Sequence, residues 1–248
     1  MSQSATSTVS DVRDVVEEFL VGLSNDTDSR TVEDILFHGH VPTSEDLGFK
    51  PERYAENNLI GELLEAVGLE YEEQPYADAR NPNWPDFELT DLDIEPDVIG
   101  ENKPFNASDE AIPDIKDYLD KKSVGAEYGI ATDGFDWYLY KIEVGGDSTN
   151  YPKVRHVDLK PVLREVARDR NLVGQTAAGE TEDAEDVLQE FVDVFGKEEF
   201  EGLLSQRAPR ELRDARKRDV EEFYELYIEL LFGEGDEHSY ETNLMNDI

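Results

Sequence analysis

Two short extended segments in the middle of the chain constrain its fold most strongly. The first runs from Trp84 to Leu89 and the second from Val98 to Phe105. Residues 90–96 between them are rich in Asp, Glu, Thr and Pro, which are typical of turns. This spacing predicts an antiparallel hairpin, so any fold of the chain has to place a β-sheet around these residues.

The rest of the chain alternates between helical and extended patterns. Apolar residues recur at helical spacing in some segments and alternate with polar residues in others. The pair Asp133-Gly134 lies between two extended segments and predicts a second hairpin. The predicted helices are residues 11–23, 32–37, 51–67 and 108–122, and the remaining predicted strands are residues 69–73, 126–132 and 135–143. This order predicts an α/β fold, with a mixed sheet flanked by helices and a helical C-terminal extension.

The periodicity also predicts how the chain divides. Residues 1–10 are polar and lack a signal-peptide core, so we expect a flexible tail. Residues 11–170 are expected to form one domain, followed by a linker at residues 171–186, where periodicity is lost. Residues 187–248 carry apolar side chains at helical spacing, which predicts a helical connector region.

The charge balance is strongly acidic. There are 60 Asp and Glu against 23 Lys and Arg, which gives a formal net charge of −37. The acidic residues are spread through periodic segments, which indicates a surface coat and not a disordered tail. Such a coat suits a cytoplasm of molar salt, where the Debye length is about 3 Å. With ten lysines, the chain resembles the acid-coated proteins of halophilic archaea; the alternative is a nucleic-acid mimic.

The composition excludes several kinds of site. The chain has no Cys, which rules out disulfides and thiolate metal sites. Its four His are scattered, which disfavours a zinc site. No apolar run approaches the ~18 residues of a membrane span, so we expect no membrane contact and a cytoplasmic location.

Charged residues of the central hairpin form a candidate metal site. A register that pairs Asp86 with Glu101 places their β-carbons about 4.5–5.5 Å apart, so both carboxylates can reach one cation. Lys103 shares a strand face with Glu101, and the carbonyl of Asn102 is a further candidate ligand. Mg²⁺ prefers oxygen ligands and activates a bound water for phosphodiester hydrolysis. The spacing therefore predicts a Mg²⁺ site, with Mn²⁺ as a substitute and Lys103 offsetting charge on the phosphate.

The Asp/Glu-x-Lys pattern alone has little specificity in so acidic a chain. It recurs at Asp114-Lys116, Asp120-Lys122 and Asp158-Lys160. The first two of these lie in a predicted helix, where residues two apart do not share a face. Asp97 is a rival first ligand, but it lies roughly 13 Å from Glu101 along the same strand. A solvated hairpin on an acidic surface remains the simpler interpretation.

Three parts of the chain resemble the PD-(D/E)xK nuclease superfamily. Residues 51–68 resemble its first helix, and residues 84–87 with residues 99–104 resemble its catalytic hairpin. Residues 128–140 are similar to a later hairpin, in which a Thr-(Asn/Asp)-Gly turn precedes an aromatic strand. The chain looks most like the N-terminal nuclease domain of type I restriction motor subunits and of fused restriction–methylation enzymes. The resemblance covers under half of the chain and implies a restriction-endonuclease-like fold.

The resemblance also implies roles for individual residues. It makes Asp86, Glu101 and Lys103 catalytic, with a Glu of the first helix in support. Glu52 aligns best with that supporting residue, and Glu56 lies one helical turn further on. The implied activity is that of a Mg²⁺-dependent DNA endonuclease in a restriction–modification or phage-defence system, with DNA as substrate and a methyltransferase or specificity subunit as partner.

One element of the family pattern is missing. The type I enzymes carry Gln-x-x-x-Tyr on the helix after the hairpin, whereas this chain has Asp114 and Tyr118 at those positions. This departure keeps open a second hypothesis, a degenerate nuclease fold that serves as a DNA- or protein-binding module. A third hypothesis is an acidic anti-restriction mimic, which predicts no metal site.

A basic stripe near the C-terminus is a candidate DNA contact. Residues 206–218 hold six of the 23 basic residues, and four of them recur at three- and four-residue steps: Arg207, Arg210, Arg213 and Lys217. Such a helical stripe can face phosphates. The alternative is a surface helix whose basic residues pair with acidic neighbours one turn away.

Overall fold

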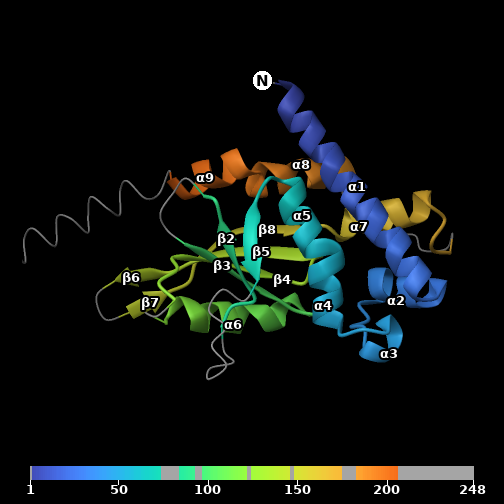
Figure 1. Ribbon diagram of the computed structural model, residues 1–248, viewed down its shortest axis with the longest axis horizontal. Helices are drawn as coiled ribbons and strands as arrows, with labels where there is room; N and C mark the ends of the chain where they lie inside the picture. The colour runs from blue at the N-terminus through green and yellow to red at the C-terminus, as the bar shows by residue number, and fades with distance from the viewer. Residues whose placement is uncertain are drawn as a thin grey trace, which may run out of the picture. The chain divides into compact units, whose positions relative to one another are not determined.

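The computed structural model describes residues 2–73, 84–92, 97–121, 124–145, 148–174 and 183–205 of the chain (Figure 1). The chain divides into two compact units, Met1–Gly202 and Leu203–Ile248. The second unit is described only at residues 203–205, so the fold reported below is that of the first. The predicted basic stripe of Arg207, Arg210, Arg213 and Lys217 lies outside the described residues.

A mixed six-stranded sheet forms the centre of the first unit. Its strands lie in the order β1-β2-β3-β4-β5-β8. They are β1 (Glu70–Glu73), β2 (Phe87–Thr90), β3 (Val98–Asn102), β4 (Tyr128–Thr132), β5 (Asp136–Lys141) and β8 (Lys153–Asp158). Neighbouring strands are antiparallel except for β3 and β4, which run parallel and are connected by the helix α6 (Ser108–Leu119). The predicted α/β class with a mixed, helix-flanked sheet is confirmed.

The central hairpin has the register predicted from the sequence. Phe87 lies opposite Gly100 and Glu88 opposite Ile99, so one further step places Asp86 opposite Glu101. A close contact explains this register, because a β-carbon added at Gly100 would lie 1.9 Å from the ring of Phe87. Only glycine leaves room for the ring at that position, and a slip by one residue would set the ring against another side chain.

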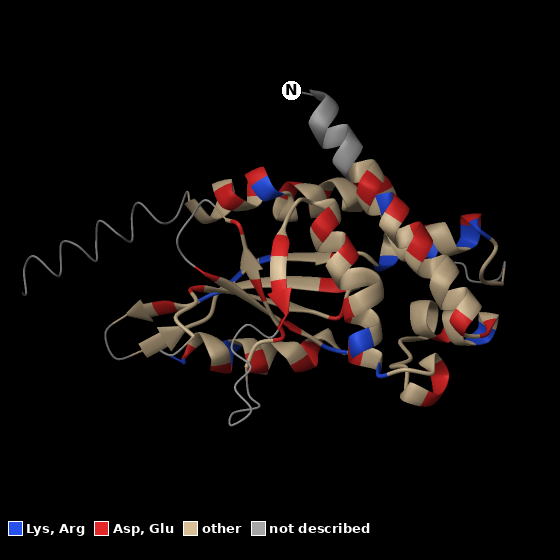
Figure 2. Ribbon diagram, viewed as in Figure 1, with Lys and Arg blue, Asp and Glu red and all other residues tan. Residues whose placement is uncertain are grey.

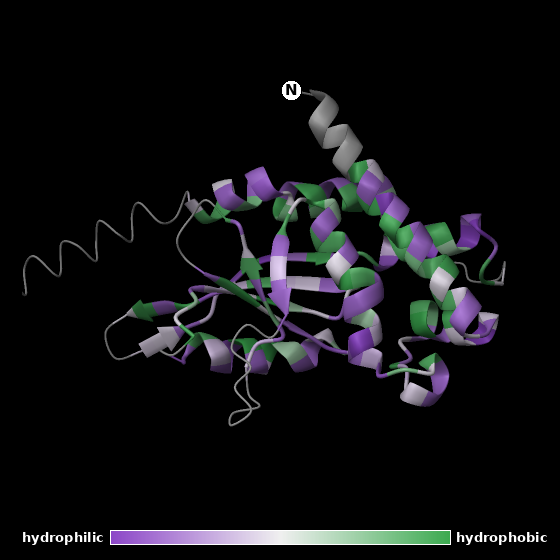
Figure 3. Ribbon diagram, viewed as in Figure 1, coloured by the Kyte–Doolittle hydropathy of each residue, from purple (hydrophilic) through white to green (hydrophobic). Residues whose placement is uncertain are grey.

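Helices cover both faces of the sheet (Figure 1). The face opposite α6 packs against α1 (Ser2–Asp26), α7 (Lys160–Asp169), α8 (Ala184–Phe195) and the helical segment Pro51–Ala66. Aromatic rings fill this layer: Phe105 stacks on Phe135 with centroids 4.7 Å apart, and Trp137 lies 5.3 Å from Phe191. Figure 3 shows the same arrangement as hydrophobic stripes along these helices.

The helix α6 packs closely on the other face of the sheet. A β-carbon added at Gly129 of β4 would lie 2.5 Å from Ile115 of α6, so glycine permits the close approach. Ile99, Ala131 and Tyr140 of the sheet belong to the same buried cluster as Ile115. This contact fixes the height of α6 above β3, the strand that carries Glu101.

The turn between β4 and β5 anchors the start of α6. The Asp133 carboxylate accepts hydrogen bonds from the backbone N–H groups of Ser108, Phe135 and Asp136. Gly134 adopts φ +86°, as the predicted Asp-Gly hairpin requires. One buried carboxylate therefore ties the second hairpin to the first turn of α6.

The predicted helix over residues 51–67 contains a π turn. It consists of α4 (Pro51–Ala55), the π segment η1 (Glu56–Ile60) and α5 (Gly61–Ala66). Its end is as predicted, because Gly68 takes φ +79° and stops the helix. π turns are often found at functional sites, and this one begins at Glu56.

Other boundaries differ from the sequence analysis. The helix α1 begins at Ser2 rather than near residue 10, and α8 begins at Ala184, inside the segment expected to be a linker. The edge strand β8 was not predicted, because a bulge opposite Leu139 and Tyr140 leaves its burial irregular along the chain. The remaining elements are α2 (Ser29–His38), α3 (Ser44–Leu47), α9 (Lys197–Ser205) and the hairpin of β6 (Glu143–Gly145) with β7 (Ser148–Asn150).

Two surface properties bear on function. Figure 2 shows Asp and Glu distributed over the helices and strands of the first unit rather than gathered in one region. None of the helices in the described part of the chain is both long and apolar enough to cross a membrane.

Candidate active site

The hairpin brings four of the predicted site residues, Asp86, Glu101, Asn102 and Lys103, together at one end of β3. Asp86 directly precedes β2, and its Oδ2 accepts a hydrogen bond of 3.0 Å from the backbone N–H of Asn102. This bond holds the Asp86 carboxylate over the end of β3, beside Glu101. Asn102 itself is buried, and the role of its carbonyl as a metal ligand stays a prediction.

Lys103 lies between two carboxylates. Its Nζ is 2.7 Å from Glu101 Oε1 and 2.7 Å from Asp114 Oδ2. Glu101 reaches it from the same strand face, as the sequence predicts, whereas Asp114 comes from α6. The contact with Asp114 was missed because a sequence pattern does not show which helical residue lies above a strand end.

Burial makes the Glu101 carboxylate unusual. Glu101 is 5% exposed, and its Oε2 has no hydrogen-bond partner in the described structure. Burial, followed by the charge of Asp86, raises the pKa of Glu101 to about 8. Burial also raises the pKa of Asp86, against the hydrogen bond from Asn102. A cation bound by both carboxylates would favour their charged forms against the cost of burial.

A third buried carboxylate belongs to the π turn. Glu56 is 4% exposed and accepts a 2.8 Å hydrogen bond from Arg53, while its Oε1 has no partner in the described structure. Burial, together with the charges of Glu73 and Asp86, raises the pKa of Glu56 to about 7 against the opposing charge of Arg53. Glu52, which aligns better with the family pattern, is exposed. Glu56 is thus the more buried of the two candidates, and the charges of both interact with that of Asp86.

These groups suit a hard divalent cation. Carboxylate oxygens are the preferred ligands of Mg²⁺, which usually keeps several of its waters and needs only one or two carboxylates from the protein. Asp86 and Glu101 supply such a pair, and the unpartnered Oε2 of Glu101 is a free ligand atom. Within the described residues, no group of three His, Asp or Glu side chains is already assembled around a metal position. The fit is therefore to a two-carboxylate site completed by water and substrate.

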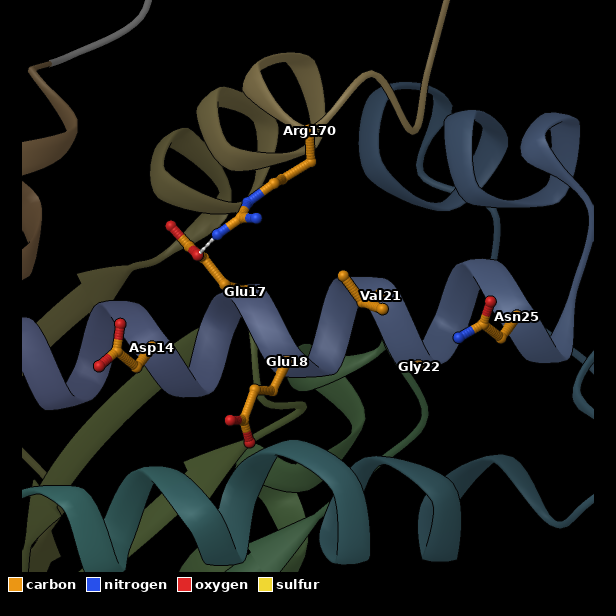
Figure 4. Close-up of a pocket in the computed structure, with 7 residues that line it drawn as sticks. All are labelled: Asp14, Glu17, Glu18, Val21, Gly22, Asn25 and Arg170. Carbon is orange, nitrogen blue, oxygen red and sulfur yellow. Dashed lines mark hydrogen bonds and ion pairs between the residues drawn. The ribbon is translucent and has the colours of Figure 1, made fainter.

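A separate groove lies along α1, away from these residues (Figure 4). It is lined by Asp14, Glu17, Glu18, Val21, Gly22, Asn25 and Arg170. Arg170, the residue directly after α7, pairs with Glu17. The groove is open and acidic, and it contains none of the hairpin residues.

Comparison with known proteins relates the chain to restriction enzymes. No family model matches the chain, and no solved structure matches it. The chain is 25% identical over 200 residues to a protein of Methanocaldococcus jannaschii described as "Putative type II restriction enzyme and methyltransferase". The match covers 77% of this chain but 16% of that protein, so the chain spans only a small part of its relative. The architecture, a mixed sheet flanked by helices, is restriction-endonuclease-like.

Proposed function

We propose that the chain is the nuclease part of a restriction–modification system, a Mg²⁺-dependent DNA endonuclease. The observation that carries this proposal is the pairing of half-buried Asp86 with buried Glu101, which the hairpin register sets opposite each other, with the ammonium of Lys103 2.7 Å from Glu101. The restriction-enzyme name of the relative supports the same class of activity.

The residues of the site divide the chemistry among them. Asp86 and Glu101 would hold the cation, and Glu56 is a third acidic group beside them. When bound, Mg²⁺ polarises the scissile phosphate and lowers the pKa of a bound water. Lys103 keeps a positive charge in the site, where it stabilises the charge that develops on the phosphate. Arg53 holds the Glu56 carboxylate in place through its 2.8 Å hydrogen bond.

The acidic surface affects the conditions under which DNA binds. At low ionic strength a net charge of −37 repels a phosphate backbone. In molar salt the Debye length falls to about 3 Å, so this repulsion no longer acts at a distance. We therefore propose that cleavage takes place in a cytoplasm of high salt concentration. A methyltransferase is the proposed partner, because the relative's name combines both activities.

Plasmid cleavage in ~2 M KCl tests the proposal. Wild type would be compared with Glu101→Ala and Lys103→Ala in the presence of Mg²⁺ or Mn²⁺. Glu143→Gln is the matched control, because Glu143 is an exposed strand acid. We expect metal-dependent nicking by wild type and the control, and none by the two site variants. Nicking that survives in both site variants would contradict the assignment of the site.

A second candidate function rests on Asp114. This carboxylate replaces the Gln of the type I pattern and lies 2.7 Å from Lys103, so an inactive nuclease fold that binds DNA or protein is the alternative. Calorimetry separates the two: Mg²⁺ binding that is lost in Glu101→Ala supports a working metal site. Absence of both cleavage and Mg²⁺ binding in wild type would favour the binding module.

A further inference from the structure

We propose that Asp114 is a positioning residue, which keeps the Lys103 ammonium in the site while Glu101 serves as a metal ligand. The inference rests on the proposed function, because it takes over the roles of Glu101 and Lys103 given there. Asp114 itself is outside the predicted set of metal ligands. Asp114, which stands where the type I pattern has Gln, would then have a function in the site of this chain.

The contact geometry places Lys103 between an inner and an outer carboxylate. Both Glu101 Oε1 and Asp114 Oδ2 lie 2.7 Å from its Nζ. The side chain of Glu101 is 7% exposed and that of Asp114 is 43% exposed. Within the described residues, these are the two carboxylates that form ion pairs with Lys103.

The two carboxylates differ in what else they can bind. Glu101 faces Asp86, and its second oxygen has no partner in the described structure, so Glu101 is the one available to a cation. A divalent cation and an ammonium compete for the same carboxylate and repel each other. Once Glu101 turns toward a metal, its bond to Lys103 weakens and Asp114 remains as the anionic partner.

The helix α6 gives Asp114 a rigid support. Its neighbour Ile115 is fully buried against Gly129, and Tyr118, one turn further on, is also buried. The start of α6 is tied to the buried carboxylate of Asp133 through Ser108. Packing of α6 therefore fixes the backbone that carries Asp114, and this keeps its carboxylate within reach of the ammonium.

An anchor of this kind matters because lysine is a flexible side chain. Its four-carbon stem carries about 2 kcal/mol of rotamer entropy, and a catalytic group displaced by about 1 Å can lower a rate about 100-fold. Loss of Asp114 is thus expected to reduce turnover while leaving the affinity for DNA unchanged or improved, since a carboxylate near the phosphates is removed.

Amine labelling of Lys103 tests the inference without relying on activity. Wild type, Asp114→Ala, Asp114→Asn and Asp117→Ala would be treated with an amine-reactive reagent in ~2 M KCl, with and without Mg²⁺, and analysed by peptide mass spectrometry. Asp117 is an exposed acid on the same helix, so its variant is the matched control. Lys50 is exposed and serves as the internal reference.

We expect Asp114→Ala to increase labelling of Lys103 about tenfold with Mg²⁺, and less without it, because Glu101 still holds the ammonium in the metal-free protein. Asp114→Asn retains an acceptor oxygen but no charge, so it should rescue Lys103 only in part, whereas Asp117→Ala should stay near wild type. In cleavage assays the same Asp114→Ala variant should lose kcat with little change in KM. Rescue by Asn distinguishes positioning of Lys103 from a loss of folding.

The outcomes separate this inference from the proposed function. Lys103 labelled equally in wild type and Asp114→Ala, with and without Mg²⁺, would overturn the inference even if wild type cleaves DNA. Increased labelling of Lys103 in Asp114→Ala supports the positioning role of Asp114, whether or not wild type cleaves DNA. If wild type fails to cleave, only the proposed function is contradicted. Circular dichroism verifies that each variant is folded, and labelling of the exposed Lys50 normalises the dose of reagent.

Discussion

At the scale of single residues, buried carboxylate oxygens without a partner in the described structure distinguish the site from other acidic residues. Most acidic side chains of the described structure are exposed, whereas Glu56 and Glu101 are almost fully buried, each with one oxygen that lacks a partner there. Burying a charge without a compensating partner is unfavourable. A buried carboxylate without a partner therefore destabilises the metal-free protein, and a bound cation would remove this cost.

Replacing Glu101 by Gln should therefore stabilise the metal-free protein. The pKa of Glu101 is raised from 4.5 to about 8 in the folded protein. The contribution of its neutral form to the free energy of unfolding is therefore fully present below about pH 4.5 and is lost as the pH rises through about 8. Glu101→Gln should raise the free energy of unfolding by roughly 1–3 kcal/mol at about pH 9 and by less at about pH 6. Urea unfolding in EDTA at both pH values measures this, with Glu143→Gln as the exposed control.

The opposite trend would show that the ion pair dominates. If Glu101→Gln destabilised the protein equally at both pH values, the 2.7 Å contact with Lys103 would outweigh the burial of the carboxylate.

The supporting Glu of the first helix can be identified by a paired substitution. Glu56 is buried, whereas Glu52 is exposed. We expect Glu56→Gln to weaken Mg²⁺ binding by about tenfold or more, and Glu52→Gln to change it little. Calorimetric Mg²⁺ titration of both variants gives the comparison, and a larger effect at Glu52 would restore the assignment made from the sequence alignment.

At the scale of elements, close packing at glycine sets the geometry of the site. The ring of Phe87 occupies the place where a side chain at position 100 would stand, and this contact sets Asp86 opposite Glu101. Gly129 lets α6 approach in the same way and thereby brings Asp114 to Lys103. The hairpin and the helix act as rigid supports for the side chains between them.

Gly100→Ala should disrupt the hairpin and the site together. The added β-carbon would lie 1.9 Å from the Phe87 ring, and overpacking of this kind costs about 1–3 kcal/mol. We expect a lower urea midpoint and loss of Mg²⁺ binding. Gly145→Ala is the matched control, because a β-carbon there meets nothing within 4 Å. The double variant Gly100→Ala with Phe87→Leu should recover part of the stability; no recovery would mean that the ring is not the cause.

The elements also show which features a sequence pattern reveals. The hairpin register could be predicted, because side-chain alternation and turn residues act locally. The π turn could not, since the apolar stripe of residues 51–67 fits a regular helix equally well. The partner of Lys103 was missed for a different reason: Asp114 meets it only through the packing of α6 on Gly129, a contact between distant parts of the chain.

At the scale of the whole molecule, the net negative charge opposes the stability of the fold. The first unit buries a continuous aromatic and aliphatic core, yet the full chain carries a net charge of −37. Self-repulsion between surface carboxylates opposes the compact state and is reduced by salt. The stability of the fold should therefore depend on ionic strength more steeply than that of a chain with balanced charges.

Thermal unfolding across a salt series tests this dependence. Raising KCl from about 0.1 M to ~2 M shortens the Debye length from about 10 Å to about 3 Å or less, so the melting temperature should rise, with most of the change at the lower concentrations. Sucrose is the control, because it favours burial without screening charge. A rise with KCl and little with sucrose supports screening as the cause. A melting temperature that stays constant across the KCl series would mean that repulsion between surface carboxylates does not limit the stability of the fold. This result would contradict adaptation to molar salt. It would favour the alternative that the acidic surface binds a basic partner.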